Sequence, residues 1–113
     1  MEIISKLSED ALKISLVGEL DANGAINLDR IISKAIADGY YKIAVDCRQL
    51  EYISSAGLGV FISYISELKS HNGKFVFYHL RENVESVFNI LGLQKVVAIT
   101  HDFTQAKNQL HEV

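Results

Sequence analysis

Two adjacent serines, Ser54 and Ser55, stand directly before a stretch whose apolar spacing predicts a helix. The first amides of a helix lack partners within it, and together with the helix dipole they favour an anion at that end. A phosphate group on Ser55 would therefore meet a preformed anion site. The small residues Ala56 and Gly57 would let the backbone of another protein approach closely. This segment is a candidate modification and binding site.

A purely structural role for the same serines is also open. Serine is among the commonest residues at the N-cap position, where its side chain accepts a hydrogen bond from an amide of the first turn. Either Ser54 or Ser55 could have this role alone. Composition and periodicity do not decide between a cap and a modification site.

Other arrangements that could do chemistry are weaker. Asp21, Asp46 and Glu51 could be imagined as a magnesium site, but Asp46 more simply ends a strand and Glu51 faces solvent. Residues 57–59 lack the lysine and the glycine spacing of phosphate-binding loops, and no serine lies in a GxSxG elbow. Cys47 is expected to be a small buried side chain, and the four histidines show no metal-ligand spacing. We therefore expect neither an enzyme, nor a metal, nor a cofactor.

The composition is that of an ordinary globular protein. The 113 residues are 49% apolar and 22% charged, with a formal charge of −3, which predicts a single domain over residues 1–113. No cluster of Lys and Arg is present in the sequence, so direct nucleic-acid binding is not expected. The chain shows neither a signal peptide nor a run of apolar residues long enough to span a membrane, and a cytoplasmic location is expected.

The elements that must position the serines alternate between strand and helix patterns. Strands are predicted at residues 3–7, 12–17, 42–46, 74–78 and 95–99, with a turn at residues 8–10 and a break that begins at Gly18. Helices are predicted at residues 22–38, from Ser55 to before Gly73, around residues 84–91 and from about Asp102 onward. The order ββαβαβαβα predicts an α/β fold with a mixed sheet of about five strands and about four helices, mainly on one face.

The helix termini and apolar faces are part of this prediction. Asp21 or Asn23 is expected to cap the first helix, Gly39 and Gly92 to follow the first and third, and Asp102 with Gln105 to form a capping box. The apolar positions expected on the buried helix faces are Ala25, Leu28, Ile31, Ile32, Ala35, Leu58, Phe61, Ile62, Ile65, Leu68, Val84, Val87, Phe88, Leu91, Phe103, Ala106 and Leu110.

Residues 53–58, Ile-Ser-Ser-Ala-Gly-Leu, resemble the signature loop of STAS domains in bacterial anti-sigma-factor antagonists. Residues 17–21, Val-Gly-Glu-Leu-Asp, resemble a second characteristic stretch of that family. Residues 88–93 with Val96 and Val97 resemble its C-terminal part. The resemblance covers nearly the whole chain in the same element order. One difference is Ser54, because many members carry Asp immediately before the phosphorylated serine.

The resemblance implies a switch between binding partners. An unphosphorylated antagonist of this family binds an anti-sigma factor, itself a serine kinase, and so releases the sigma factor. The kinase phosphorylates the loop serine, here Ser55, and a PP2C-type phosphatase removes the phosphate. The partner-binding residues implied for this chain are Asp21, Ser54, Ser55, Ala56, Gly57 and Leu58. The alternative is a STAS subunit docked constitutively in another assembly, such as a lipid-transport ABC complex or a stressosome-like scaffold.

Overall fold

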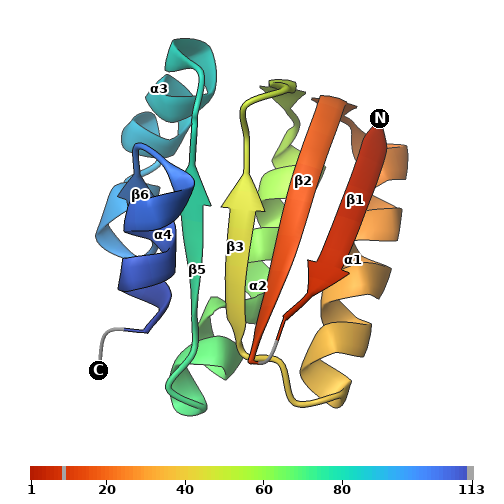
Figure 1. Cartoon of the computed structure of the whole chain (residues 1–113). Coiled ribbons are helices and arrows are strands. Elements are labelled where there is room, and N and C mark those ends of the chain that lie inside the picture. Colours follow the sequence, from red (N-terminus) through yellow and green to blue (C-terminus); the bar gives the residue numbers. More distant parts are fainter. Residues whose placement is uncertain (9, 112–113) are drawn as a thin grey trace.

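A mixed sheet forms the centre of the molecule (Figure 1). The structure, a computed structural model, describes residues 1–8 and 10–111. Within these residues the sheet has six strands: β1 (Glu2–Leu7), β2 (Ala11–Leu20), β3 (Lys42–Asp46), β4 (Leu50–Ile53), β5 (Lys74–Tyr78) and β6 (Ala98–Thr100). The strand order is β1-β2-β3-β5-β6, and β4 pairs with the last residues of β2. Only the β1–β2 pair is antiparallel among these described strands.

Helices cover both faces of this sheet. Helices α1 (Ala22–Ala37) and α2 (Ser55–Ser70) lie side by side behind it in Figure 1, and α4 (Phe103–Leu110) lies in front of it. Helix α3 (Glu82–Ile90) and a short 3-10 helix, η1 (Leu93–Lys95), connect β5 to β6. The α/β class, the four helices and the mixed sheet are as the sequence predicts.

Alternation along the central strands builds a core on each face. In β5, Phe75 and Phe77 pack into the large cluster under α1 and α2, whereas Val76 and Tyr78 face α4. In β3, Val45 belongs to the large cluster and Ala44 to the smaller one. Successive side chains of a strand point to opposite faces, so a strand covered on both sides is apolar throughout. The buried runs at residues 43–45 and 75–78 follow from this geometry.

Two strand predictions were wrong. Strand β2 does not break at Gly18 but continues to Leu20. Its pairing with β3 ends at Ser15, and its pairing with β4 begins at Gly18 and has a register shift between Gly18 and Glu19. Strand β4 was not predicted, because only its end residues Leu50 and Ile53 are buried, and this spacing fits neither a strand nor a helix period. The sheet therefore has one strand more than expected within the described residues.

The C-terminal third also differs from the prediction. Residues 95–99 do not form one strand: η1 includes Lys95, Val96 is exposed, and β6 begins only at Ala98. Three residues expected in the core, Ile62, Leu91 and Phe103, are instead 46%, 56% and 42% exposed. Helices α1 and α3 end before Gly39 and Gly92 as predicted. The predicted turn at residues 8–10 includes residue 9, which lies outside the described residues.

The C-terminal end of α2 contacts the start of β3 closely. Gly73 donates its amide to the Leu68 carbonyl at 2.7 Å, and Lys74 donates to the Tyr41 carbonyl at 3.0 Å. A Cβ atom at Gly73 would collide with that same carbonyl, so only glycine fits this approach. The rings of Tyr41 and His71 stack with centroids 4.1 Å apart. These contacts hold the far end of α2 against the sheet.

Candidate functional site

The serine loop is joined to the end of β2 by the β2–β4 pairing. Leu20 lies opposite Ile53 in this parallel pair, and Ser54 donates its amide to the Leu20 carbonyl at 2.9 Å. Because Asp21 follows Leu20 directly, the ladder brings Asp21 next to the loop that precedes α2. The sequence separates these two segments by more than thirty positions, and the unpredicted strand β4 is what brings them together.

The two serines have different positions at the start of α2. Ser54 has an extended backbone, with φ −81° and ψ 166°, and its Oγ accepts a hydrogen bond from the Gly57 amide at 3.1 Å. Ser54 is therefore the N-cap, and Ser55 is the first residue of the helix. Of the two serines that the sequence left open for this role, the structure thus assigns the cap to Ser54, which is hydrogen-bonded to an amide of the first turn.

The Ser55 side chain is exposed. Among the hydrogen bonds of the described residues, none includes its hydroxyl group. A side chain in this position projects from the first turn, where the helix dipole favours negative charge. An enzyme that modifies Ser55 would thus find the hydroxyl accessible and would leave the cap at Ser54 in place.

Asp21 starts the neighbouring helix in the same manner. Its Oδ1 accepts a hydrogen bond from the Gly24 amide at 2.8 Å, which makes Asp21 the N-cap of α1 rather than Asn23. Helices α1 and α2 follow the parallel strands β2 and β4, so both helices begin at the same edge of the sheet. The N-terminal ends of α1 and α2 therefore lie at the same end of the molecule, together with the Asp21 carboxylate and Ser55.

The remaining residues of the predicted binding set divide between surface and core. Ala56 is exposed, but Gly57 and Leu58 are buried. A Cβ atom at Gly57 would lie 2.7 Å from Cγ and Cδ2 of Leu20, so glycine is required here for α2 to approach β2. The small size of Gly57 serves the internal packing and does not open the surface to a partner's backbone, which corrects the role expected from the sequence.

The sequence analysis did not assign to the site several exposed apolar side chains on the elements that adjoin the serine loop. Tyr52, just before the loop, is 52% exposed, and Ile62 in α2 is 46% exposed. Residues 55, 59 and 62 are spaced by four and three positions, so they share one face of α2. Ile26, in the second turn of α1, is 59% exposed. Ile62 follows Ser55 by seven residues, which is about two helical turns. Once Ser55 is taken as exposed, this spacing indicates that Ile62 lies on the exposed face of α2 and not in the core.

The rest of the chain offers little for catalysis or metal binding. Within residues 1–8 and 10–111, no three His, Cys, Asp or Glu side chains lie close enough together to hold a metal ion. Burial, with a smaller contribution from Asp46, raises the pKa of the Cys47 thiol far above its usual range, which keeps the thiol neutral. None of the helices described is long and apolar enough to cross a bilayer.

Comparison with known proteins agrees with this architecture. The anti-sigma-B factor antagonist of Listeria monocytogenes is 25% identical over 96 residues, which cover 85% of this chain and 84% of that protein. Among solved structures, a Thermotoga maritima protein superimposes with a TM-score of 0.89 at 23% identity, over 97% of this chain and 95% of that one. The phosphorylated form of the Bacillus cell fate determinant SpoIIAA superimposes with a TM-score of 0.77 at 21% identity, over 97% and 100%.

The family assignment rests on the match to a whole domain. The family model of the STAS domain matches residues 2–108, which include all six strands and most of α4. The fold, the loop at residues 53–58 and the family model all lead to the same conclusion: this chain belongs to the STAS domain family.

Proposed function

We propose that this STAS domain is an anti-sigma-factor antagonist that binds its anti-sigma factor when Ser55 is unphosphorylated and releases it when Ser55 carries phosphate. The names of its curated relatives support the class of function. The observation that carries the site assignment is the division between the two serines. Ser54 caps α2 through its hydroxyl, while Ser55 exposes an unbonded hydroxyl one residue later.

The binding surface proposed for the anti-sigma factor surrounds Ser55. It consists of exposed side chains around the first turns of α1 and α2, together with one side chain two turns further along α2: Asp21, Ile26, Tyr52, Ser55, Ala56 and, further along, Ile62. Clustered exposed apolar side chains are typical of protein interfaces, which combine an apolar core with a polar rim. Gly57 and Leu58 would support this surface from below without contacting the partner.

Phosphorylation would act through charge at the interface and leave the fold unchanged. A phosphoserine carries about −1.5 to −2 charges at neutral pH. The dipole of α2 would stabilise this charge by about 0.3–1 kcal/mol in the free protein. In the complex the same group would be desolvated, and like charge or unmatched charge at an interface costs several kcal/mol. Since about 1.4 kcal/mol is tenfold in affinity, we expect phosphorylation to weaken binding at least 100-fold.

The proposed partners follow from this cycle. The anti-sigma factor would be the serine kinase that modifies Ser55, and a PP2C-type phosphatase would restore the binding form. The domain itself would have no catalytic activity and would act in the cytoplasm. An ATPase-type kinase gene or a phosphatase gene next to the gene for this chain would identify the proteins needed for the test.

The decisive experiment combines mapping of the phosphate with calorimetry. After incubation with the neighbouring kinase and ATP, peptide mass mapping should place one phosphate on Ser55. Titration of the kinase without ATP should give similar affinities for wild type and Ser55→Ala, and at least 100-fold weaker binding for Ser55→Asp. Ser54→Asp is the matched control, because it adds the same charge but keeps a side chain that can cap α2.

Two outcomes would contradict the proposal. Phosphate mapped to Ser54 would show that Ser55 is not the phosphorylation site and serves only as the first residue of α2. Equal affinities of the Ser55→Ala and Ser55→Asp variants would instead favour constitutive docking, the behaviour of a STAS subunit in a permanent assembly. Circular dichroism of each variant checks that its fold is intact.

A further inference from the structure

A groove lies on the face of the sheet opposite α1 and α2, beside α4. Helix α4 packs over β3, β5 and β6 and leaves the adjoining part of β2 uncovered (Figure 1). The groove has a volume of about 280 Å³. Its floor is apolar because Ala11 and Ala44 are small strand residues that leave space beneath the side chains of Phe103 and Leu110. Phe103 remains 42% exposed at its edge.

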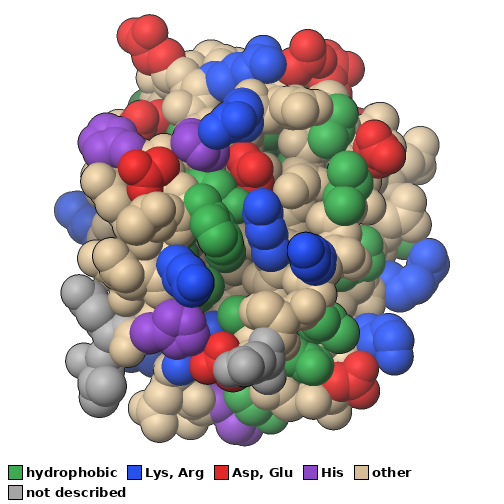
Figure 2. Space-filling model, viewed as in Figure 1, with side chains coloured by type: hydrophobic (Ala, Val, Ile, Leu, Met, Phe, Trp, Pro, Cys, Tyr) green, Lys and Arg blue, Asp and Glu red, His purple; other side chains and the backbone are tan. Residues whose placement is uncertain are grey.

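Basic side chains surround this apolar floor. Lys6, Lys13, Lys107 and His111 line the groove, and the Lys13 ammonium lies 4.8 Å from the centre of the Phe103 ring. Figure 2 shows Lys, Arg and His side chains gathered around exposed apolar side chains on this face. The whole chain has a net charge of −3, so this concentration of positive charge is local. Among the described residues, Lys6, Lys13 and Lys107 make no ion pair.

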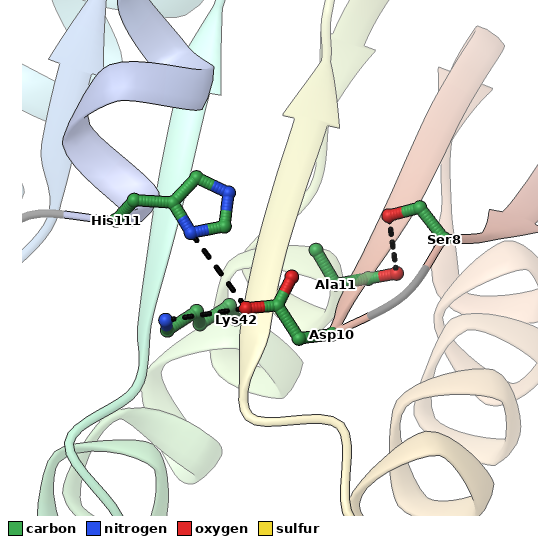
Figure 3. Close-up of polar contacts among 5 residues, drawn as sticks. All are labelled: Ser8, Asp10, Ala11, Lys42 and His111. Atoms are coloured by element: carbon green, nitrogen blue, oxygen red, sulfur yellow. Dashed lines mark hydrogen bonds and ion pairs between the residues drawn. The ribbon is translucent and has the colours of Figure 1, made fainter.

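Among residues 1–8 and 10–111, the Asp10 carboxylate lies next to the groove and is paired. Asp10 Oδ2 is 3.4 Å from the Lys42 ammonium and 3.6 Å from His111 Nδ1 (Figure 3). Ser8 closes the adjacent turn by donating its hydroxyl to the Ala11 carbonyl at 3.2 Å. These contacts join the β1–β2 hairpin to β3 and to the end of α4, and they hold the groove's lower wall in place. The three lysines therefore face the groove with their charge uncompensated by Asp10.

We propose that this groove binds a free medium-chain carboxylate, with its head group at the lysines and its chain along the apolar floor. An anionic head would form charge-assisted hydrogen bonds with Lys13 and Lys107. The tail would lie against the exposed face of Phe103 above the small side chains of Ala11 and Ala44, and each methylene that it buries should raise the affinity about fourfold. The groove is at the small end of ligand sites, so it fits a single acyl chain and not a peptide helix.

This site is separate from the serine switch. The groove lies on the α4 face, whereas α2 and its first turn lie on the other face. Binding of a carboxylate here does not depend on the anti-sigma-factor proposal. The failure of one proposal leaves the other intact.

The test uses the whole chain and decanoate below its micellar concentration. Titration calorimetry should show one saturable site. Decanol has the same chain as decanoate without the charge, and it should bind at least tenfold more weakly than decanoate. Butyrate has the charge but a short chain, and it should also bind at least tenfold more weakly than decanoate. Chemical shifts of the Ala11, Ala44 and Leu110 amides or methyls should change on titration. Vesicles of anionic phospholipid should not bind under the same conditions.

Variants locate the head group. Lys13→Gln with Lys107→Gln should weaken decanoate binding at least tenfold. The matched control is Lys69→Gln with Lys95→Gln, which removes the same charge from a second apolar groove between α2 and η1 and should leave affinity unchanged. Phe103→Ala should weaken binding of decanoate but not alter folding, because this ring is partly exposed. Four results would overturn the proposal: no saturable binding, equal affinity for decanol, equal loss in the control variant, or binding to vesicles alone.

Discussion

At the scale of single residues, Ser54 and Ser55 differ in what their hydroxyl groups contact: Ser54 caps α2, whereas Ser55 is exposed. The Ser54 oxygen is bonded to the Gly57 amide, so phosphorylation there would alter the group that caps α2 as well as add charge. The Ser55 oxygen has no such bond among the described residues and lies at the surface. A charge added at Ser55 therefore changes the surface while the start of α2 stays intact.

This division predicts different stabilities for two alanine variants. Ser54→Ala should lower the free energy of unfolding by about 1 kcal/mol, because the Gly57 amide loses its partner. Ser55→Ala should change it by less than about 0.5 kcal/mol, because this side chain is exposed and alanine favours helix. Urea unfolding followed by circular dichroism measures both values. Equal losses in the two variants would mean that Ser55 also has a structural role.

The candidate site was predictable to the extent that it depends on local sequence. Asp21 as a cap and Ser55 near a helix start both followed from residue type next to an apolar period. Which serine caps did not, because both residues have the same hydroxyl and the choice depends on where β4 ends. The role of Gly57 was misassigned because its neighbour Leu20 is distant in sequence and becomes visible only in the fold.

At the scale of elements, the contact between α2 and β2 depends on Gly57. The Leu20 side chain lies against this glycine and is fully buried, so it has little room to move. Gly59, two residues later, faces open space, and a Cβ atom added there would meet no atom within 4 Å. One glycine thus permits packing, whereas the other lowers the helix propensity without any compensating contact.

These two glycines make a matched pair for mutation. Gly57→Ala should destabilise the domain by about 1–2 kcal/mol, the cost of overpacking reduced by the gain in helix propensity. Gly59→Ala should stabilise it by up to about 1 kcal/mol. Thermal unfolding of both variants would measure the difference. If Gly57→Ala were as stable as Gly59→Ala, α2 would not pack on Leu20 as closely as described.

The elements that were predicted correctly have a clear pattern of apolar residues within their own sequence. Helix α1 and strands β3 and β5 bury continuous faces, and burial of this kind leaves a clear pattern in the sequence. Strand β4 has four residues and a single partner, and β6 has three residues that are all only half-buried. In such short edge elements, the pairing with a distant strand decides the conformation, and local residue type contributes little.

At the scale of the whole molecule, β3 and β5 connect the two apolar clusters. Each strand sends alternate side chains to opposite faces, so neither cluster can lose its packing without exposing the other. We therefore expect one cooperative unfolding transition. Circular dichroism and tyrosine fluorescence should give the same urea midpoint, even in Leu110→Ala, which should cost about 2–5 kcal/mol in the smaller cluster. Separate midpoints would show that α4 unfolds on its own.

The contacts at Gly73 and Tyr41 have a mechanical consequence for signalling. Helix α2 is held by hydrogen bonds beyond both of its ends: the Ser54 amide donates to the Leu20 carbonyl before the first turn, and the Lys74 amide donates to the Tyr41 carbonyl after the last turn. A shift of α2 along its axis would break both of these hydrogen bonds, so we expect α2 to stay in place when a group is added at Ser55. If Ser55 is phosphorylated as proposed, we therefore expect the partner to respond to the phosphate by direct contact with the start of α2.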